Sequence, residues 1–293
     1  SGKWEVTNYY GFDEKNKIVY YQSVENGSIN RDVYSISIDG KAKKRLTLKT
    51  GTNNATFSPN FQYFINTYSS ATAAPYYSLN DSKTSLEIKK IQSNEAVEEK
   101  LAKYNVASKE FSTITTEKGH VLNTWMIKPK DFDPNKKYPV FMFQYSGPGS
   151  QQVDNAWNGT DDYWFMMLAQ KGYIVACVDG RGTGFKGAEF KKCTQKELGK
   201  YEVEDQIDAA KVFGKYTFVD KSRIGIFGWS FGGFMAANCV FQGADVFKSA
   251  IAVAPVTSWR YYDSIYTERY MQTPQENASG YDNNSPISHV NKL

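Results

Sequence analysis

The residues most clearly suited to catalysis form one short motif, Gly228-Trp229-Ser230-Phe231-Gly232. This G-x-S-x-G pattern puts a serine on a sharp turn between a strand and a helix. Residues 224–227 before it are apolar and predict a strand, and residues 234–239 after it predict a helix. A serine at such a turn could attack a carbonyl carbon while helix N–H groups stabilise the oxyanion. The flanking elements favour this interpretation over a glycine-rich loop with a bystander serine.

The elements that must position this motif begin at Tyr138, where apolar strands start to alternate with helical segments. Such alternation predicts βαβ units and a mostly parallel sheet. We expect strands at 140–145, 173–178, 224–227 and 250–254, and helices at 162–170 and 203–211. Ligands of such sheets bind at the carboxyl ends of the strands. The side chains that follow these strands could therefore converge on one cleft: Tyr145, Asp179, Ser230 and Val256.

Residues 1–103 read as short strands and turns, with a helix-prone connection at 95–104. Residues 12–17 and 57–62 each lead into a strand, and their offset of 45 residues suits a four-stranded propeller blade. A propeller needs about four to eight blades, so two would be only part of one. The alternative is a small β-sandwich, and we favour the propeller. Two further strands at 111–116 and 121–127 predict a hairpin whose turn holds His120, interpreted as an exposed polar residue rather than a base.

The amino-acid composition limits the classes of protein to which the chain can belong. With 293 residues, 41% apolar and 23% charged, the chain is that of an ordinary globular protein with two domains. A net charge of +4 without a basic, aromatic-interleaved tract argues against nucleic acid as a partner. No apolar run approaches the roughly 18 residues of a membrane helix. Three scattered cysteines and two histidines offer no metal-ligand spacing, so no cofactor is expected.

Four motifs together resemble one family. They are Asp179-Gly180-Arg181-Gly182-Thr183-Gly184, Glu202-Val203-Glu204-Asp205-Gln206, the turn at 228–233, and residues 261–270, Tyr-Tyr-Asp-Ser-Ile-Tyr-Thr-Glu-Arg-Tyr. They are similar to motifs of the dipeptidyl peptidase IV branch of the prolyl oligopeptidase family, in a bacterial member. The resemblance implies an α/β-hydrolase domain at 104–293, lacking its C-terminal part. It also implies that residues 1–103 are the last, all-β blades of a β-propeller, and that the chain is an interior segment of a longer parent protein.

The resemblance also assigns site residues by position. Ser230 corresponds to the nucleophile, Tyr145 to the oxyanion-hole tyrosine, and the backbone N–H of Phe231 to its partner donor. Most family members have tyrosine where Phe231 stands, but the backbone is what acts there. The pocket that receives the proline ring corresponds to Val256, Trp259, Tyr262 and Tyr266. Aromatic walls suit a flat apolar ring. Spacings of three and four also suit one face of a helix, so plain core aromatics are the alternative.

The proton shuttle of such an enzyme is not evident in this sequence. His289 is the single histidine after the nucleophile, with Asp245, Asp263 and Asp282 before it. The family places its triad acid and base after further strands, beyond Leu293, and its amine-binding glutamates in propeller blades before residue 1. We therefore interpret His289 as a surface loop residue. The isolated 293-residue chain is expected to be inactive or nearly so.

The resemblance thus predicts a serine exopeptidase that releases Xaa-Pro or Xaa-Ala dipeptides through an acyl-enzyme on Ser230. Its partners would be peptides with penultimate proline or alanine, and the full-length protein would be a homodimer. The sequence does not fix the compartment, although the resemblance favours a periplasmic, cell-surface or secreted protein. Two alternatives stay open: an esterase or endopeptidase on the same fold, and a catalytically silent propeller-hydrolase that binds partners.

Overall fold

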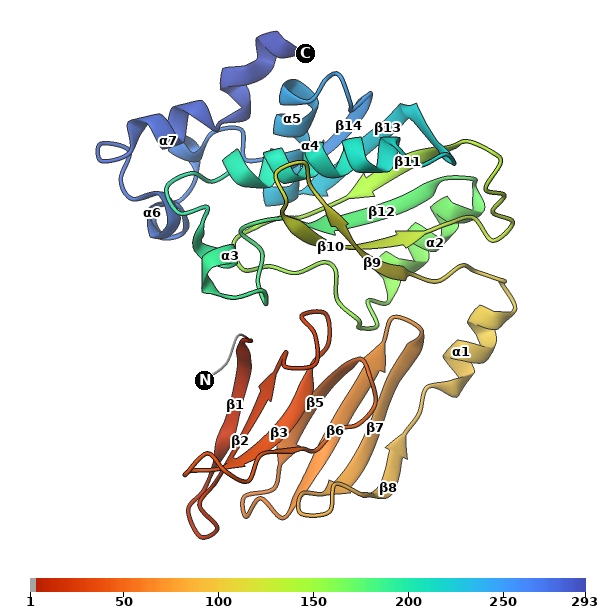
Figure 1. Cartoon of the computed structure of the whole chain (residues 1–293), viewed down its shortest axis with the longest axis vertical. Coiled ribbons are helices and arrows are strands. Elements are labelled where there is room, and N and C mark those ends of the chain that lie inside the picture. The colour runs from red at the N-terminus through yellow and green to blue at the C-terminus, as the bar shows by residue number, and fades with distance from the viewer. Residues whose placement is uncertain (1–3) are drawn as a thin grey trace. The chain divides into compact units, whose positions relative to one another are not determined.

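The computed structural model describes residues 4–293, which form two compact units (Figure 1). One unit holds residues up to 108 together with 154–163 and 185–187, and the other holds 109–153, 164–184 and 188–293. The boundary predicted at residues 103 and 104 lies just after helix α1 (Glu95–Ala102). Residues 1–3 of the predicted blade region fall outside the described residues. Each unit is treated separately below.

The first unit is built from two antiparallel sheets of four consecutive strands each. Their orders are β1-β2-β3-β4 and β5-β6-β7-β8, which is the meander of propeller blades. The first contains β1 (Val6–Asp13), β2 (Ile18–Ser23), β3 (Asp32–Ser37) and β4 (Lys44–Arg45). The second contains β5 (Thr52–Phe57), β6 (Tyr63–Ser70), β7 (Ala73–Asp81) and β8 (Glu87–Gln92). The β1–β2 and β5–β6 hairpins hold the two repeated segments, so the prediction of blades rather than a sandwich is confirmed.

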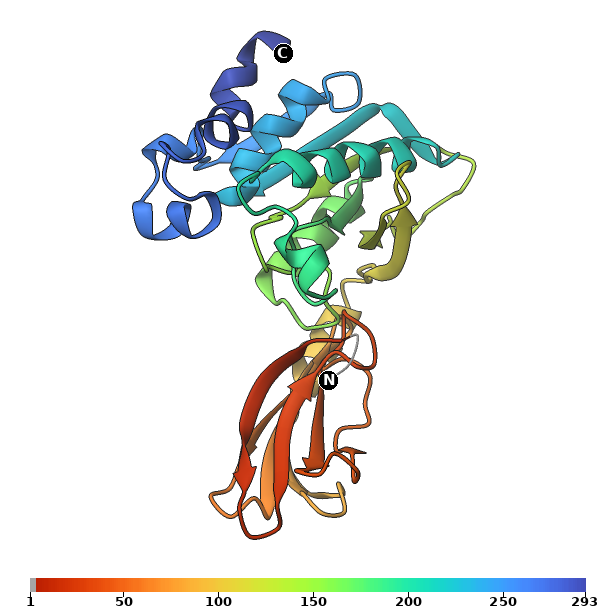
Figure 2. The ribbon, with the colours of Figure 1, turned by 60° about the vertical axis from the view of Figure 1, so that its left-hand side comes forward.

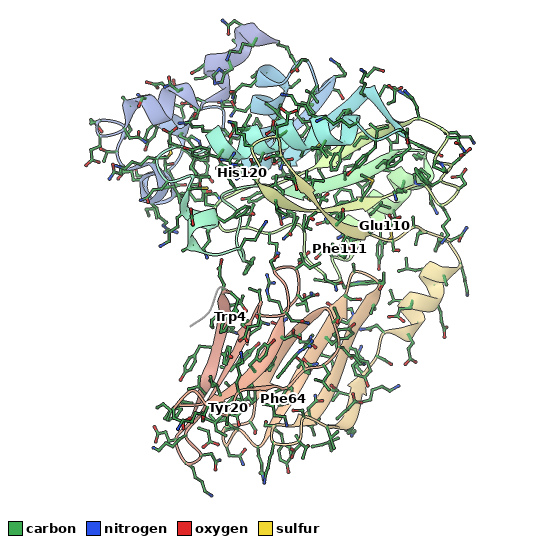
Figure 3. The ribbon with its side chains drawn as sticks, in the orientation of Figure 1. Trp4, Tyr20, Phe64, Glu110, Phe111 and His120 are labelled. Atoms are coloured by element: carbon green, nitrogen blue, oxygen red, sulfur yellow. The ribbon has the colours of Figure 1, made fainter. Side chains whose placement is uncertain are left out.

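A small aromatic core joins the two blade sheets. The Tyr20 ring of β2 stacks on Phe61 at 5.0 Å between centroids and contacts Phe57 at 4.6 Å. Phe64 of β6 is buried in the same cluster, and Figure 3 shows Tyr20 and Phe64 among the strands of this unit. Aromatic pairs at such spacings add to the burial of their apolar area. The high tyrosine and phenylalanine content of the sequence therefore has a structural role in the blades.

The second unit is centred on a six-stranded sheet of order β14-β13-β11-β12-β10-β9. Strands β11 (Tyr138–Phe143), β12 (Ile174–Asp179), β13 (Val219–Trp229) and β14 (Ser249–Val253) are parallel neighbours. β9 (Glu110–Thr115) and β10 (Val121–Ile127) form the predicted antiparallel hairpin at one side. At the other side β14 pairs with β13 alone among the described strands. The predicted parallel sheet is confirmed.

Helices cover both faces of this sheet (Figures 1 and 2). Side chains alternate along β11: Val140 and Met142 belong to the buried cluster shared with α4 (Lys200–Gly214) and α5 (Phe231–Gln242), whereas Phe143 meets Phe165 of α2 (Thr160–Gln170) at 4.9 Å. β12 is buried along its whole length and is an almost continuous apolar run, whereas Ser249, Ile251 and Ala252 of β14 are exposed. Among residues 4–293, no helix combines the length and apolar character that a membrane crossing requires.

Shorter helices complete the second unit. They are α3 (Ala188–Lys192), η1 (Trp259–Tyr261), α6 (Ser264–Met271), α7 (Ala278–Asn283) and η2 (Pro286–Lys292). Asp263 caps α6 by accepting the Tyr266 N–H at 2.8 Å. Tyr281 of α7 is buried and donates its hydroxyl to the Gln272 carbonyl at 2.6 Å. The segment 261–270, which carried the most specific part of the resemblance, is thus fixed at both ends of α6.

An ion-pair joint connects the loop after β12 to the start of α4. The Arg181 guanidinium donates to Asp205 at 2.7 and 3.0 Å and to Glu204 at 2.6 Å. The Arg181 N–H also donates to Asp205, at 2.7 Å. Asp205 is fully buried, so losing its partner would leave an uncompensated buried charge. Two motifs of the family resemblance therefore meet here in one ion-pair network.

Glu202 lies fully buried in the first turn of α4. One of its carboxyl oxygens accepts the Gly199 N–H at 3.0 Å, and the other has no hydrogen-bond partner among the described residues. Burial raises the pKa of Glu202 from 4.5 to about 8, against the opposing effect of backbone N–H donors. The carboxyl is therefore protonated at neutral pH in the folded state and ionised in the unfolded state.

This difference predicts a pH-dependent cost of folding. Between pH 4.5 and about 8 the unfolded state binds fewer protons at Glu202 than the folded state, so stability falls as pH rises. Glu202→Gln keeps an acceptor for Gly199 and removes the titration. In the parent protein, the difference in melting temperature between this variant and wild type should grow from pH 5 to pH 8. The control Glu117→Gln removes an exposed carboxyl and should show no such growth. A constant difference across this range would contradict the assignment.

Candidate active site

The turn at Ser230 has the strained geometry of a nucleophile turn. β13 ends at Trp229 and α5 begins at Phe231, so Ser230 alone joins strand to helix. Its φ of 56° and ψ of −114° are unfavourable for a residue with a side chain. Such a conformation costs on the order of 1–3 kcal/mol and persists only where its surroundings fix it. Here the Ser230 N–H donates to the Val253 carbonyl at 2.9 Å, and the Ser230 carbonyl accepts the Phe234 N–H at 3.0 Å.

The glycines of the motif allow a close approach of neighbouring backbone; they do not supply the positive φ of the turn. A Cβ on Gly232 would lie 2.6 Å from the Gln144 carbonyl oxygen, and one on Gly233 would lie 2.6 Å from the Val253 carbonyl oxygen. Neither glycine has a positive φ. The residue that takes a positive φ at this turn is Ser230 itself. The glycines let the start of α5 press against β11 and β14.

Tyr145 follows β11 and reaches the same place as Ser230. The Tyr145 ring lies beside that of Phe231, at 6.1 Å between ring centroids, and the Ser230 side chain is near enough to affect the pKa of Tyr145. Burial raises the pKa of Tyr145 above its usual value, with help from Tyr262 and Tyr270, and the nearby Ser230 side chain opposes this rise only in part. The phenol therefore keeps its proton at neutral pH. A half-buried O–H donor beside a serine hydroxyl is what an oxyanion hole requires.

The loop that carries Tyr145 is fixed by buried amides that the sequence did not single out. Gln144 is fully buried, and its Nε2 donates to the Gly232 carbonyl at 2.8 Å. The Ser146 hydroxyl donates to Gln144 Oε1 at 3.1 Å, and Gln206 Nε2 donates to Ser146 at 3.3 Å. These bonds connect the end of β11 to the start of α5 and to α4. The available signal was a glutamine inside an otherwise apolar strand end.

The residues assigned to the proline pocket do gather beside this turn. Trp259 is buried and packs on Phe231 at 5.5 Å between ring centroids. Tyr266 stacks on Trp259 at 5.9 Å, and Tyr262 meets Tyr266 edge to face at 5.5 Å. Tyr262 is 43% exposed, whereas Trp259 is 1% exposed. The aromatics therefore form one wall from the core to the surface, and the partly buried Val256 packs against the same core cluster.

Asp179 does not join Ser230, contrary to the expectation of four converging side chains. Its carboxylate is buried and accepts the backbone N–H groups of Gln152 and Val153 at 2.8 to 3.1 Å. A carboxylate that holds a loop in this way has its lone pairs committed to amides. A residue at the end of a parallel strand lies at the edge where ligands bind, but its side chain can point into the cleft or toward a neighbouring loop. The sequence alone did not show which of these Asp179 does.

The histidines and later aspartates have contacts of their own. His289 Nε2 pairs with the Asn283 carbonyl at 2.8 Å. Asp282 pairs with Arg260 at 2.6 Å. Within residues 4–293, neither histidine is hydrogen-bonded to Ser230. His120 lies in the turn between β9 and β10 (Figure 3). His120 is partly buried in its turn, and His289 is partly buried within η2 rather than in a loop, so their interpretation as surface residues instead of bases stays a prediction.

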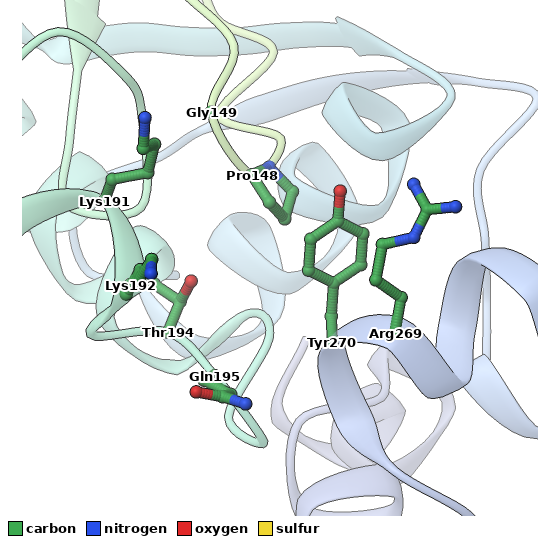
Figure 4. Close-up of a pocket in the computed structure, with 8 residues that line it drawn as sticks. All are labelled: Pro148, Gly149, Lys191, Lys192, Thr194, Gln195, Arg269 and Tyr270. Carbon is green, nitrogen blue, oxygen red and sulfur yellow. The ribbon is translucent and has the colours of Figure 1, made fainter. Parts of the chain in front are cut away.

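A separate pocket opens next to the aromatic wall (Figure 4). Its volume is about 430 Å³. The lining residues come from the loop after β11, from α3 and the loop behind it, and from α6: Pro148, Gly149, Lys191, Lys192, Thr194, Gln195, Arg269 and Tyr270. Tyr270 meets Tyr266 of the wall at 5.0 Å between centroids. The pocket is therefore lined by three cations, and no acidic residue is among its described lining residues.

An α/β-hydrolase turn in one unit and propeller blades in the other define a two-part hydrolase architecture, and comparison with known proteins agrees. Residues 160–293 match the model of the prolyl oligopeptidase family, and residues 1–75 match that of the dipeptidyl peptidase IV N-terminal region. The chain belongs to the prolyl oligopeptidase family, in its dipeptidyl peptidase IV branch.

Particular relatives show the same pattern. The chain is 40% identical, over its whole length, to a probable dipeptidyl-aminopeptidase B of Trichophyton verrucosum, of which it covers 33%. Among solved structures it matches dipeptidyl peptidase 4 of Porphyromonas gingivalis with 49% identity and a TM-score of 0.96, covering all of this chain and 41% of that one. A putative dipeptidyl aminopeptidase IV from Bacteroides ovatus matches with 32% identity, a TM-score of 0.90 and the same coverage. The chain spans about a third of the length of the curated relatives it matches.

The close backbone contact at Gly232 gives a testable prediction. Gly232→Ala would put a methyl group 2.6 Å from the Gln144 carbonyl oxygen, where backbone on both sides must shift. We expect a loss of roughly 1–3 kcal/mol in unfolding free energy and slower labelling of Ser230 by a fluorophosphonate, both measured on the parent protein. Gly214→Ala is the matched control, because its nearest neighbour would be Lys221 Cβ at 3.5 Å. Wild-type stability and labelling in Gly232→Ala would show that the contact is not constraining.

Proposed function

We propose that the parent protein is a serine exopeptidase that releases Xaa-Pro or Xaa-Ala dipeptides from free N-termini. Ser230 would be the nucleophile, Tyr145 O–H and Phe231 N–H the oxyanion donors, and the aromatic wall with Val256 the pocket for the penultimate residue. The observation that carries the proposal is the strained strand-to-helix turn at Ser230, with the Tyr145 ring packed beside Phe231 of the same turn. Family membership supports the same reaction class.

The chemistry follows from the positions of these groups. Ser230 Oγ would attack the carbonyl carbon of the penultimate residue and form a tetrahedral oxyanion, while its proton passes to a base from the rest of the parent protein, which later gives it to the leaving amine. Tyr145 donates one hydrogen bond to that oxygen. Phe231 is the first residue of α5, so its N–H has no partner within the helix and can donate the second. Cleavage of the C–N bond releases the shortened peptide as an amine that takes up a proton, and water then hydrolyses the ester on Ser230.

The wall also supports a preference for a small flat ring. Trp259 is fixed in the core by Phe231 and Phe234, at 5.5 and 5.0 Å, so the pocket floor is rigid. Tyr262 and Tyr266 close the side at 5.5 Å from each other. A rigid aromatic pocket buries proline or alanine and excludes longer side chains. Homodimer formation by the parent protein stays a prediction from the family resemblance.

The exopeptidase proposal predicts a requirement for a free amine. The parent protein should cleave Gly-Pro and Ala-Pro chromogenic substrates and leave their N-acetylated forms uncut, while Ser230→Ala abolishes cleavage. Equal rates on free and acetylated substrates would favour the esterase or endopeptidase alternative. A silent binding protein would cleave neither and would leave Ser230 unlabelled by a fluorophosphonate. Mass spectrometry of the products reports the length of the released fragment.

The oxyanion role of Tyr145 predicts a kinetic signature. Tyr145→Phe removes one donor to the developing charge while leaving the ring in place, so kcat should fall roughly 10²- to 10³-fold with a much smaller change in KM. Tyr173→Phe, which removes the hydroxyl of a partly exposed tyrosine just before β12, is the control and should behave as wild type. If Tyr145→Phe mainly raised KM, the hydroxyl would serve binding rather than transition-state stabilisation.

A further inference from the structure

The cationic pocket beside the aromatic wall has no part in the acyl-transfer chemistry above. We infer that it binds a carboxylate side chain of the peptide substrate, so that peptides with Asp or Glu at one position near the scissile bond are preferred. Three residues supply the charge: Lys191, Lys192 and Arg269. The inference rests on the proposed peptidase function, because the ligand is a side chain of that substrate.

The positive charge of the pocket favours the binding of an anion. Arg45, Arg181, Arg223 and Arg260 each pair with an aspartate. Arg269, by contrast, forms no ion pair within the described part of the chain, and neither does Lys192. Like charges lining one cavity of about 430 Å³ repel each other, so a bound anion is favourable there. Neutral donors complete the lining, namely the Tyr270 hydroxyl, Thr194 and the Gln195 amide (Figure 4).

The pocket is held in place by backbone contacts between its walls. The Gly149 N–H donates to the Gly182 carbonyl at 2.8 Å, and the Gly182 N–H donates to the Phe190 carbonyl at 2.9 Å. The Lys196 N–H donates to the Tyr270 carbonyl at 2.7 Å, which attaches the loop behind α3 to α6. A preformed site loses less ordering entropy when it binds a ligand than a mobile one does.

The location makes substrate the fitting source of the carboxylate. Pro148 lies three residues after Tyr145, and Tyr270 packs against Tyr266 of the aromatic wall. Both walls are thus continuous with residues proposed to hold the oxyanion and the penultimate side chain. An extended peptide advances roughly 3.3–3.6 Å per residue. A side chain one or two residues from the scissile bond can therefore enter the pocket, where arginine can grip its carboxylate through two N–H groups.

The test compares matched peptides on the parent protein. Peptides of a Xaa-Pro series would carry Glu or Gln at the first residue, or at the first or second residue after the scissile bond. We expect kcat/KM to favour Glu over Gln roughly tenfold at one of these positions, and the ratio to shrink with added salt. Arg269→Gln and Lys192→Gln should each bring the ratio toward one. The matched control Lys136→Gln removes a lysine charge outside the pocket and should leave the ratio unchanged.

Other outcomes distinguish failure of this inference from failure of the proposed peptidase function. Cleavage of neutral Gly-Pro substrates with a ratio near one at every position would overturn the inference and leave the proposed function standing. No cleavage of any peptide would overturn the proposed function and the inference with it. A Glu preference that survives both pocket substitutions would assign it to another site. Inorganic phosphate is the last arm: phosphate that binds in wild type but not in Arg269→Gln, without any Glu preference, would make the pocket a free-anion site instead.

Discussion

The close approach of three backbone segments at Ser230 is the constraint on which the rest of the catalytic unit depends. The start of α5 contacts the end of β11 through Gly232 and the end of β14 through Gly233, at distances that exclude a side chain. Only this packing holds Ser230 at a φ of 56°. The same contact brings Tyr145 to the serine, because Tyr145 directly follows the residue that Gly232 touches. Nucleophile and oxyanion donor are therefore positioned by one piece of packing.

Around this contact, buried polar groups fix the positions of strands and helices through directional hydrogen bonds, which apolar packing does not provide. Gln144 joins β11 to the helix start, and Arg181 with Asp205 joins the β12 loop to α4. Each group has few alternatives, since a buried amide or charge without a partner is costly. Directional bonds of this kind fix register between elements, whereas the apolar cluster between sheet and helices fixes only their distance. Burying a polar group also costs free energy: Glu202 is buried without a cationic partner among the described residues, and its carboxyl is therefore protonated at neutral pH.

The parallel sheet could be predicted from the sequence more fully than the blades. Long apolar runs and glycine turns identified β11 to β14 within about two residues, apart from the polar start of β13. In the blades the sequence predicted short strands but not all of their positions, because polar residues such as Asn53 of β5 (Thr52–Phe57) are buried there by hydrogen bonds instead of by apolar patterning. The site residues that the resemblance assigned do gather around Ser230. The direction of Asp179 and the cationic pocket could not be predicted, since both depend on where a loop returns.

The turn at Ser230 depends on a strand that comes later in the chain. Val253 of β14 accepts the serine N–H, and β13 pairs with β14 from Gly225 with Ser249 to Trp229 with Val253. The geometry of the nucleophile can therefore form only after residues 249–253 have joined the sheet. During synthesis Ser230 is an ordinary serine until that strand arrives, so the protein gains its reactive hydroxyl late in folding.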